Sequence, residues 1–274
     1  MDDAIPAIHP TAIIEPGARL GHGCRIHAHA VVTRHCRLAE GVTVHAFAVL
    51  GGDPQYLGFA PATETGVVIG PGTVIREHCT INRSIHAGRD TVIGGQCLLM
   101  ANAHVGHDCI VEDGVVLANN VMLAGHVAVG RGTFIGGGAG VHQFCRIGET
   151  VMIGGLSRLA QDVPPCVMAA ERNEVIGLNV VGMKRRGIAR EAVTELKDAY
   201  RVVYGSPGSV REAARAALST GRFRTVEAQR FLVFFTEGRR GFARPRRASA
   251  IADHVLDRAS GWRPRADSNG RPSP

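Results

Sequence analysis

Residues 93–129 decide the fold, and they read IGGQCLLMANAHVGHDCIVEDGVVLANNVMLAGHVAV. An aliphatic residue stands at every sixth position of this stretch, beginning with Ile93 and ending with Val129. Four residues after such an anchor stands a slim side chain, as Cys97 does after Ile93. Neither the 3.6-residue period of an α-helix nor the two-residue period of an ordinary strand produces this series. The stretch therefore predicts a six-residue structural repeat.

The same period extends in both directions. The other aliphatic anchors are Ile8, Ile14, Leu20, Ile26, Val32, Leu38, Val44, Leu50, Ile69, Ile75, Ile81, Ile135, Val141, Ile147, Ile153 and Leu159. Three hexads fit one triangular coil in which the anchors point inward and short strands stack about 4.8 Å apart. Glycines would serve the corners that need a positive φ. The fold class expected is mainly β, a left-handed parallel β-helix followed by a C-terminal α-helical domain.

Composition narrows the class of protein further. The 35 glycines among 274 residues follow no Gly-X-Y period, which excludes collagen. No run of about 18 apolar residues predicts a membrane span, and the acidic start Met1-Asp2-Asp3 does not resemble a signal peptide. The seven cysteines contain no Cys-x-x-Cys pair, so we expect free thiols and a cytoplasmic protein. Five of them take the slim inward position as core filler: Cys24, Cys36, Cys97, Cys109 and Cys145.

The chain divides into a coil, a helical part and a tail. The β-helix domain is predicted over residues 1–165, with an inserted loop at 51–68 and a tighter excursion at 85–91. Two prolines, Pro164 and Pro165, would end the coil because proline cannot donate to another rung. Residues 166–242 are predicted to be helical, and residues 243–274 a disordered basic tail. The helical stripes expected are Val193, Leu196, Tyr200, Val203, Tyr204; Val210, Ala214, Ala217, Leu218; and Phe231, Val233, Phe234, Phe235.

Charge is distributed unevenly between the two parts. Residues 1–183 hold 11 basic and 15 acidic residues, a balance of −4, whereas residues 184–274 hold 20 basic and 9 acidic ones, a balance of +11. Such an excess indicates a solvated helical surface or an acidic partner, which can be nucleic acid, anionic lipid or protein. Among these partners, nucleic acid is the weaker prediction.

Histidine is concentrated where the coil is predicted, with twelve of the thirteen at or before His142. Because each coil holds three hexads, His107, His126 and His142 lie near one edge on successive coils, and His104 flanks the same cleft. An earlier series that recurs once per coil, His9, His27 and His45, is interpreted as a structural ladder.

Two kinds of chemistry suit the row from His104 to His142. In one, a neutral imidazole acts as a general base, Asp108 orients His107, and Gly125 offers a backbone N–H to an oxyanion. In the other, three histidines hold Zn²⁺ and leave a position open for water. The residues alone leave both open.

Five sequence blocks stand out: Asn102-Ala-His104-Val-Gly-His107-Asp108-Cys109, Leu117-Ala-Asn-Asn120, Leu123-Ala-Gly125-His126-Val127, Val141-His142-Gln143-Phe144-Cys145 and Gln161-Asp-Val-Pro-Pro165. Together they resemble one known family, the acyl-carrier-protein-dependent UDP-N-acetylglucosamine O-acyltransferases of lipid A biosynthesis. The resemblance continues through Gly177-Leu-Asn179, Gly182-Met-Lys-Arg-Arg-Gly187, Phe234-Phe235 and Arg240-Gly241, and it covers roughly residues 1–242.

This resemblance implies an enzyme that moves a 3-hydroxyacyl chain from acyl carrier protein to the 3-position of the UDP-sugar, as the first step of lipid A biosynthesis. It implies that His107 is the general base, Asp108 its orienting partner and Gly125 the oxyanion position. It further implies substrate contacts at His104, His126, His142, Gln143, Gly155 (the acyl-length position), Asn179, Arg185 and Arg186. The family is a homotrimer with active sites between neighbouring prisms and uses no cofactor, because the phosphopantetheine thioester is the co-substrate.

Five positions depart from the family pattern. Gln55 is followed by Tyr56 where an acidic residue is usual, and a lysine is also missing from that loop. Asn82 and Asn173 stand in place of histidines, and Val181 replaces an acidic residue. These departures leave open a paralogue that acylates an amino-sugar nitrogen, and a β-helix that assembles without catalysis. A zinc lyase of the γ-carbonic-anhydrase type, with His104, His107 and His126 as ligands, is the third alternative.

Overall fold

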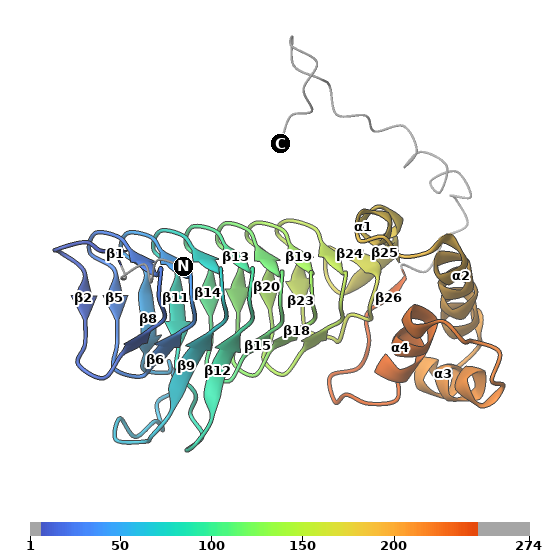
Figure 1. The fold of residues 1–274 in the computed structure, drawn as a ribbon. Coiled ribbons are helices and arrows are strands. Elements are labelled where there is room, and N and C mark those ends of the chain that lie inside the picture. Colours follow the sequence, from blue (N-terminus) through green and yellow to red (C-terminus); the bar gives the residue numbers. More distant parts are fainter. Residues whose placement is uncertain (1–6, 246–274) are drawn as a thin grey trace, which may run out of the picture.

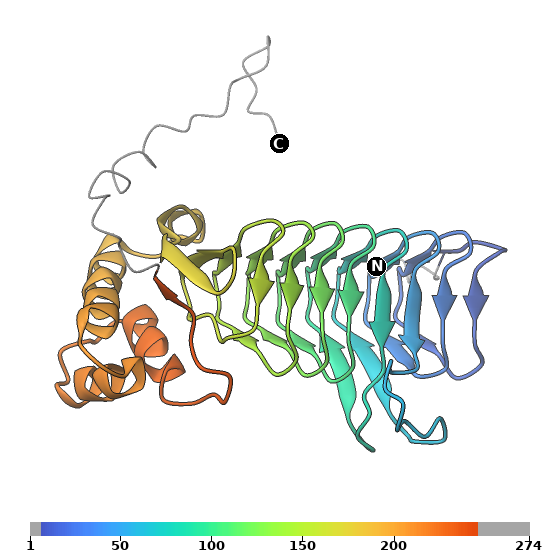
Figure 2. The same cartoon turned by 180° about the vertical axis from the view of Figure 1, so that it is seen from behind.

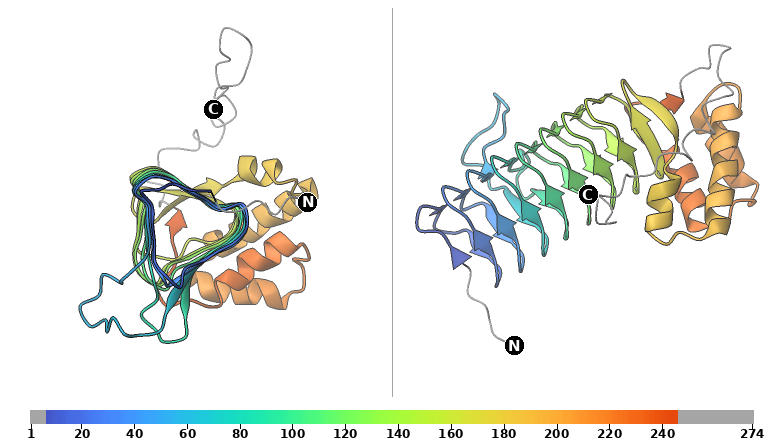
Figure 3. Two further views of the ribbon diagram at one scale, coloured as in Figure 1. Left: turned by 60° about the vertical axis from the view of Figure 1, so that its left-hand side comes forward. Right: turned by 90° about the horizontal axis from the view of Figure 1, so that it is seen from above.

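The computed structural model describes residues 7–245, and they form a triangular prism of β-strands with a helical part at one end (Figure 1). Three sheets make the three sides, and an end-on view shows their corners superposed along the axis (Figure 3). The predicted left-handed parallel β-helix with C-terminal helices is confirmed. We call the 11-, eight- and seven-stranded sheets I, II and III.

Each sheet collects every third strand of the coil. Sheet I contains β1 (Ala7–Ile8), β4 (Arg25–Ile26), β7 (Thr43–Val44), β10 (Val74–Ile75), β13 (Leu98–Leu99), β16 (Val116–Leu117), β19 (Phe134–Ile135), β22 (Met152–Ile153), β24 (Val167–Ala170), β25 (Glu174–Leu178) and β26 (Arg244–Pro245). Sheet II contains β2 (Ile13–Ile14), β5 (Val31–Val32), β8 (Val49–Gly52), β11 (Thr80–Asn82), β14 (His104–Val105), β17 (Met122–Leu123), β20 (Gly140–Val141) and β23 (Arg158–Leu159). Sheet III contains β3 (Arg19–Leu20), β6 (Cys36–Leu38), β9 (Gly66–Ile69), β12 (Asp90–Ile93), β15 (Ile110–Val111), β18 (Ala128–Val129) and β21 (Arg146–Ile147).

The strands of the coil pair in parallel, and in each regular coil a residue lies opposite its equivalent three hexads later. His104 lies opposite Met122, Met122 opposite Gly140, and Gly140 opposite Arg158. Residues one coil apart therefore form columns along the outside of the prism. These columns decide which side chains meet at the site described below.

The prism interior is filled by the aliphatic anchors and the slim residues between them. Leu99, Val105 and Leu123 are fully buried. The five cysteines predicted to be core filler are buried, as are Cys79 and Cys166, and all seven are free thiols. Burial raises the pKa of the thiols, to about 12 for Cys109. All seven are therefore packing residues, and the prediction had covered five of them.

Glycine is not the only residue type that takes a positive φ at the corners of the coil. Among residues 7–245, 15 glycines and 14 other residues have a positive φ, and the other residues include Asn102, Asp108 and His126 at corners of the coil. The expectation that glycine serves these corners was incomplete, because a short polar or ring side chain can point outward from the corner and stack on its neighbour one coil away. His29, Phe47 and His78 form such a stack, with ring centroids 5.1 Å apart. The predicted ladder stacks as well, with His27 and His45 centroids 4.7 Å apart.

Two loops leave the prism at the corner between sheets II and III (Figure 3). Val49 pairs with Thr80, so the first loop lengthens its coil by two hexads and one further residue, and this extra residue shifts the phase of the repeat. The Arg83 side chain is 1% exposed and ties this loop down by donating to the Pro61 and Thr63 carbonyls at 2.7 Å. It also pairs with Asp53 at 2.8 Å. The second loop, at 83–89, adds one hexad and keeps the register.

The C-terminal part contains α1 (Val180–Arg185), α2 (Arg190–Gly205), α3 (Val210–Ser219) and α4 (Val226–Phe234). Figure 2 shows these helices at the end of the prism farthest from the first coils. Arg146 of the coil links the two parts, because it donates to the carbonyls of Phe234 and Glu237, each at 3.0 Å. Arg230 of α4 pairs with Glu149 of the coil at 2.9 Å.

Three details of the predicted organisation differ from the structure. The coil does not end at Pro165, since β24 lies after the prolines, pairs in parallel with β22, and its Ala169 carbonyl accepts from the Gly154 N–H at 2.8 Å. Val233 is 48% exposed, and Leu232 is the buried residue of that turn of α4. Ala243 is buried and Arg244 begins a strand that pairs with β25, so the predicted tail begins later than residue 243. The rest of that tail, 246–274, lies outside the described residues. Within 7–245, no helix has the length and apolarity that crossing a bilayer requires.

Candidate active site

The candidate site lies at the corner between sheets II and III, one coil beyond the two loops. Two columns of side chains meet there. One contains His107, Gly125 and Gln143, and the other contains Asp108, His126 and Phe144. Successive members of each column are one coil apart, so the register alone brings them together.

Asp108 is held in place by several hydrogen bonds. Its φ is +60°, a left-handed conformation that favours a corner and directs its carboxylate outward. The carboxylate accepts hydrogen bonds from the Ser84 hydroxyl and from the Ile85 N–H at 3.1 Å. Burial alone would raise the pKa of Asp108, but the hydrogen bonds from Ser84, His107 and Ile85 outweigh it and hold the pKa below its usual value. Asp108 therefore stays ionised.

The ionised carboxylate orients His107. Asp108 Oδ2 lies 2.8 Å from His107 Nδ1, and a carboxylate can only accept, so Nδ1 carries the proton. The other ring nitrogen, Nε2, is then free to accept a proton from a bound molecule. This is the arrangement that a general base requires.

Gly125 lies directly beneath the His107 ring. A Cβ atom at Gly125 would come within 2.5 Å of both Cε1 and Nε2 of His107, so this close approach requires glycine. The N–H of Gly125 takes part in no backbone hydrogen bond within residues 7–245. A donor that has no partner and lies beside the base is suitable for an oxyanion.

His104 and His126 flank the His107–Asp108 pair. His104 Nδ1 lies 2.7 Å from the Thr80 hydroxyl, and burial lowers the pKa of His104, as does the neighbouring His107. The His126 ring stacks on Phe144 with centroids 4.5 Å apart. Burial lowers the pKa of His126 too, although Asp108 opposes the shift. Both imidazoles are therefore neutral near pH 7.

His142 is contacted by a residue of the C-terminal part. Arg240 donates to His142 Nδ1 over 2.8 Å, so this nitrogen is unprotonated. Arg240 is far from His142 along the chain, and the sequence pattern did not identify it as a neighbour of the site. Gln143 follows His142 and lines the same cleft.

A cleft of about 980 Å³ opens along sheet II beside these residues. Predicted residues line it at His104, His107, Gly125, His142 and Gln143. The sequence reasoning missed Thr80, Arg158 and Arg172, which line it as well, and did not count Gln55 and Asn82 as lining residues. Arg158 stands three coils after His104 in the same column, so the coil period could have found it.

The remaining predicted residues lie at the other two corners of the same prism. Gly155 is at the corner between β22 and β23, where sheets I and II meet. Asn179 caps α1 by accepting from the Gly182 N–H at 2.9 Å, and its Nδ2 donates to the Thr150 carbonyl at the corner of sheets III and I. Arg186 donates to the Gly132 carbonyl at that corner, and Arg185 is exposed. One chain therefore brings together His104 to Gln143 but not these four residues.

The structure defines the contacts or exposure of three residues that depart from the family pattern. Asn82 is 8% exposed and donates to the Asp53 carbonyl at 2.9 Å, while its Oδ1 has no hydrogen-bond partner among the described residues. Asn173 has φ of +59°, and its Oδ1 accepts from the N–H groups of Ala160 and Gln161. Val181 is 63% exposed. Asn82 thus keeps a buried acceptor without a partner among the described residues, whereas Asn173 stabilises a turn.

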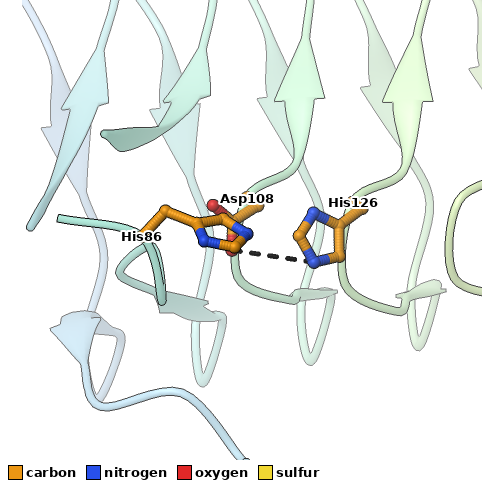
Figure 4. Close-up of side chains that lie close together, drawn as sticks. All are labelled: His86, Asp108 and His126. Atoms are coloured by element: carbon orange, nitrogen blue, oxygen red, sulfur yellow. Dashed lines mark ion pairs between the residues drawn. The ribbon is translucent and has the colours of Figure 1, made fainter. Parts of the chain in front are cut away.

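The histidines do not form the zinc site considered from the sequence. Within residues 7–245, one group of His, Cys, Asp and Glu has all its ligand atoms within 4.8 Å of one another, and it is His86, Asp108 and His126 (Figure 4). His104 and His107 are not part of it. The ligand set proposed for the γ-carbonic-anhydrase alternative is therefore not assembled.

A hexapeptide β-helix that carries a carboxylate-oriented histidine beside an unpaired backbone N–H indicates the class of hexapeptide-repeat acyltransferases. Comparison with known families agrees: residues 90–125 match the bacterial transferase hexapeptide family (six repeats), and residues 162–243 match domain 2 of the UDP-N-acetylglucosamine O-acyltransferases. The chain belongs to the acyl-[acyl-carrier-protein]–UDP-N-acetylglucosamine O-acyltransferase family of enzymes. The predicted family is confirmed.

The relatives differ in how much of the chain they match. A curated O-acyltransferase of this name from Anaeromyxobacter sp. (strain K) is 38% identical over 258 residues, which is 87% of this chain and 100% of the relative. The relative from Burkholderia orbicola (strain MC0-3) is 51% identical, but over 80 residues, 29% of this chain and 30% of the relative. The UDP-N-acetylglucosamine acyltransferase structure from Campylobacter jejuni has a TM-score of 0.77 at 33% identity, covering 87% of this chain and all of that one. The Moraxella catarrhalis O-acyltransferase structure has a TM-score of 0.72 at 37% identity, covering 86% and 99%.

Proposed function

We propose that this chain transfers a 3-hydroxyacyl group from acyl carrier protein to the 3-hydroxyl of UDP-N-acetylglucosamine, the first step of lipid A biosynthesis. The observation that carries this proposal is the 2.8 Å contact between Asp108 and His107 Nδ1, which leaves Nε2 facing the cleft above Gly125. The whole-length relative named for this reaction supports the choice of substrates.

The chemical step uses one base and one oxyanion donor. The sugar 3-hydroxyl attacks the thioester carbonyl, a C–O bond forms, and His107 Nε2 takes the hydroxyl proton. The Gly125 N–H donates to the oxyanion of the tetrahedral intermediate. When the intermediate collapses, the C–S bond breaks and His107 returns the proton to the phosphopantetheine sulfur. Atoms and protons balance without a cofactor, which is why we propose none.

A homotrimer would complete the site. His107, Gly155 and Asn179 lie at three different corners of one prism. A cleft between neighbouring prisms would set the corner that bears His107 on one chain against a different corner of the next. On this proposal the acyl-length residue and the nucleotide-binding residues come from more than one chain. Light scattering should then give a mass of roughly 3 × 29.0 kDa.

The positive charge of the C-terminal part supports an acidic carrier protein as partner. The free thiols support a reducing compartment. The balance of +11 over residues 184–274 suits an acidic carrier protein better than a neutral one. Arg158 and Arg172 line the cleft and offer positive charge to a phosphate. Seven buried free thiols suit a reducing compartment, so we propose the cytoplasm.

The decisive test is His107→Ala with His45→Ala as its matched control. His45 belongs to the structural ladder at another corner, so its loss should leave transfer intact. We expect His107→Ala to lose transfer at least about 10²-fold while circular dichroism and oligomeric mass stay those of the parent. The assay should offer carrier proteins with several acyl lengths, and both UDP-N-acetylglucosamine and a UDP-sugar with a 3-amino group. Transfer retained by His107→Ala would refute the role of the base.

A further inference from the structure

His86 lies beside the catalytic pair but has no place in the proposed reaction. It stands on the loop at 83–89, is exposed, and does not line the cleft. Its ring is 5.6 Å from that of His126, centroid to centroid, and both rings face the Asp108 carboxylate (Figure 4). The three side chains come from three successive coils, each at the corner between sheets II and III.

From this geometry we propose a regulatory Zn²⁺ site made of His86, Asp108 and His126. Two imidazoles and one carboxylate are a ligand set that zinc uses when it leaves a position open for water. The Asp108 and His126 ligand atoms are 4.0 Å apart, and all three lie within 4.8 Å of one another. Tetrahedral zinc with bonds of about 2.0 Å holds its ligands about 3.3 Å apart. A turn of the exposed His86 ring and a small shift of the carboxylate close this difference.

Two of the three ligands are already oriented for a metal. The His126 ring is fixed by its stacking on Phe144. Asp108 is fixed by Ser84 and by the Ile85 N–H. His86 completes the set, and its own N–H is anchored on the Ser84 hydroxyl at 2.9 Å. Arg89 adds positive charge near His126, but its side chain is exposed and can turn into solvent.

The site shares Asp108 with the base, and this sharing makes it regulatory. Asp108 Oδ2 is both the acceptor of the His107 Nδ1–H and the carboxylate oxygen nearest to His126. A zinc ion bound there competes for the same lone pairs, so His107 loses the partner that orients it. Bound Zn²⁺ therefore inhibits acyl transfer reversibly. This regulatory part rests on the proposed function, whereas the metal site itself does not.

The test compares the parent protein with His86→Ala and with His78→Ala. His78 is an exposed histidine at the corner of sheets I and II and serves as the control for general histidine loss. Calorimetry with Zn²⁺ on metal-free full-length protein should give one site per chain in the parent and in His78→Ala. In His86→Ala the Kd should rise at least about tenfold, because one of three ligands is missing. Mg²⁺, which prefers oxygen ligands, should not bind there.

Activity supplies the second, separate readout. Zn²⁺ should inhibit transfer by the parent, a chelator should restore it, and His86→Ala should keep full basal activity with at least about tenfold lower sensitivity to Zn²⁺. Equal Zn²⁺ affinity in the parent and in His86→Ala would overturn the site. Binding at the site without inhibition would overturn its regulatory role. An absence of transfer under any condition counts against the proposed function, while the calorimetry still decides the metal site.

Discussion

Substituting Gly125 by alanine tests how closely the base is positioned. The added Cβ would lie 2.5 Å from His107 Cε1 and Nε2, and ordinary contact begins at 3.4 Å, so the ring must retreat by 3.4 − 2.5 = 0.9 Å. A misplacement of about 1 Å costs about 10²-fold in rate, which corresponds to about 2.7 kcal/mol of transition-state stabilisation. The backbone N–H remains in place. The predicted loss therefore reports the position of the His107 ring.

The fold should tolerate this change. The φ of Gly125 lies outside the left-handed region. Alanine already occupies the equivalent corner position at Ala28, Ala46 and Ala101, each two residues after an anchor. We expect a change in the free energy of unfolding of less than about 1 kcal/mol.

The assay is the initial rate of acyl transfer under saturating donor and acceptor, together with thermal unfolding of each variant. Gly205→Ala is the control, because a Cβ there meets nothing within 4 Å and the residue is remote from the site. Gly125→Ala should lose about 10²-fold in kcat with nearly unchanged unfolding, and Gly205→Ala should lose nothing. A kcat for Gly125→Ala within threefold of the parent would show that the ring does not need this position.

Three further predictions concern stability and reactivity. Arg83→Met should lower the free energy of unfolding by about 2–3 kcal/mol and speed proteolysis within 53–65, because the loop carbonyls lose their buried donor. The control is Arg131→Met at an exposed position. Equal proteolysis of both variants would contradict the role of Arg83. The pKa of His104 is lowered in the fold, so the unfolded chain binds the extra proton and stability should fall as pH drops below 6.5. In His104→Gln, the free energy of unfolding measured with urea should depend less on pH between about pH 7 and 5. An unchanged pH dependence would exclude this contribution. All seven thiols are buried, and burial raises the pKa of Cys36 and Cys79 to about 11. A thiol reagent should therefore modify none of the seven until the protein unfolds. Rapid modification of the native protein would contradict that packing.

Much of the site was predictable because the β-helix converts sequence spacing into distance. Once a coil is known to hold three hexads, His107 must stack over Gly125. The same count, with the inserted hexad allowed for, also gives the place of Thr80 in the column of His104, but Thr80 was missed. The blocks around His107 and His142 also carried the family resemblance. These predictions needed only the period and the motifs.

Contacts that cross loops or domains were not predictable in this way. Arg83 is fully buried among loop carbonyls, although an arginine in a loop is usually exposed. Arg240 reaches His142 only because the helical part folds back beside the coil. Both positions depend on irregular backbone, whose path no period describes.

The amino-acid sequence by itself determined the coil and its register and singled out His107 as the candidate base, because the anchor-and-slim alternation is a local steric rule repeated at a constant interval. Only the tertiary structure decided how those residues act. It oriented the Asp108 carboxylate through a left-handed corner, set His86 against it, and distributed Gly155 and Asn179 to other corners of the prism. The physical reason is that a corner dihedral and a loop path are set by contacts between distant segments, which spacing along the chain does not record.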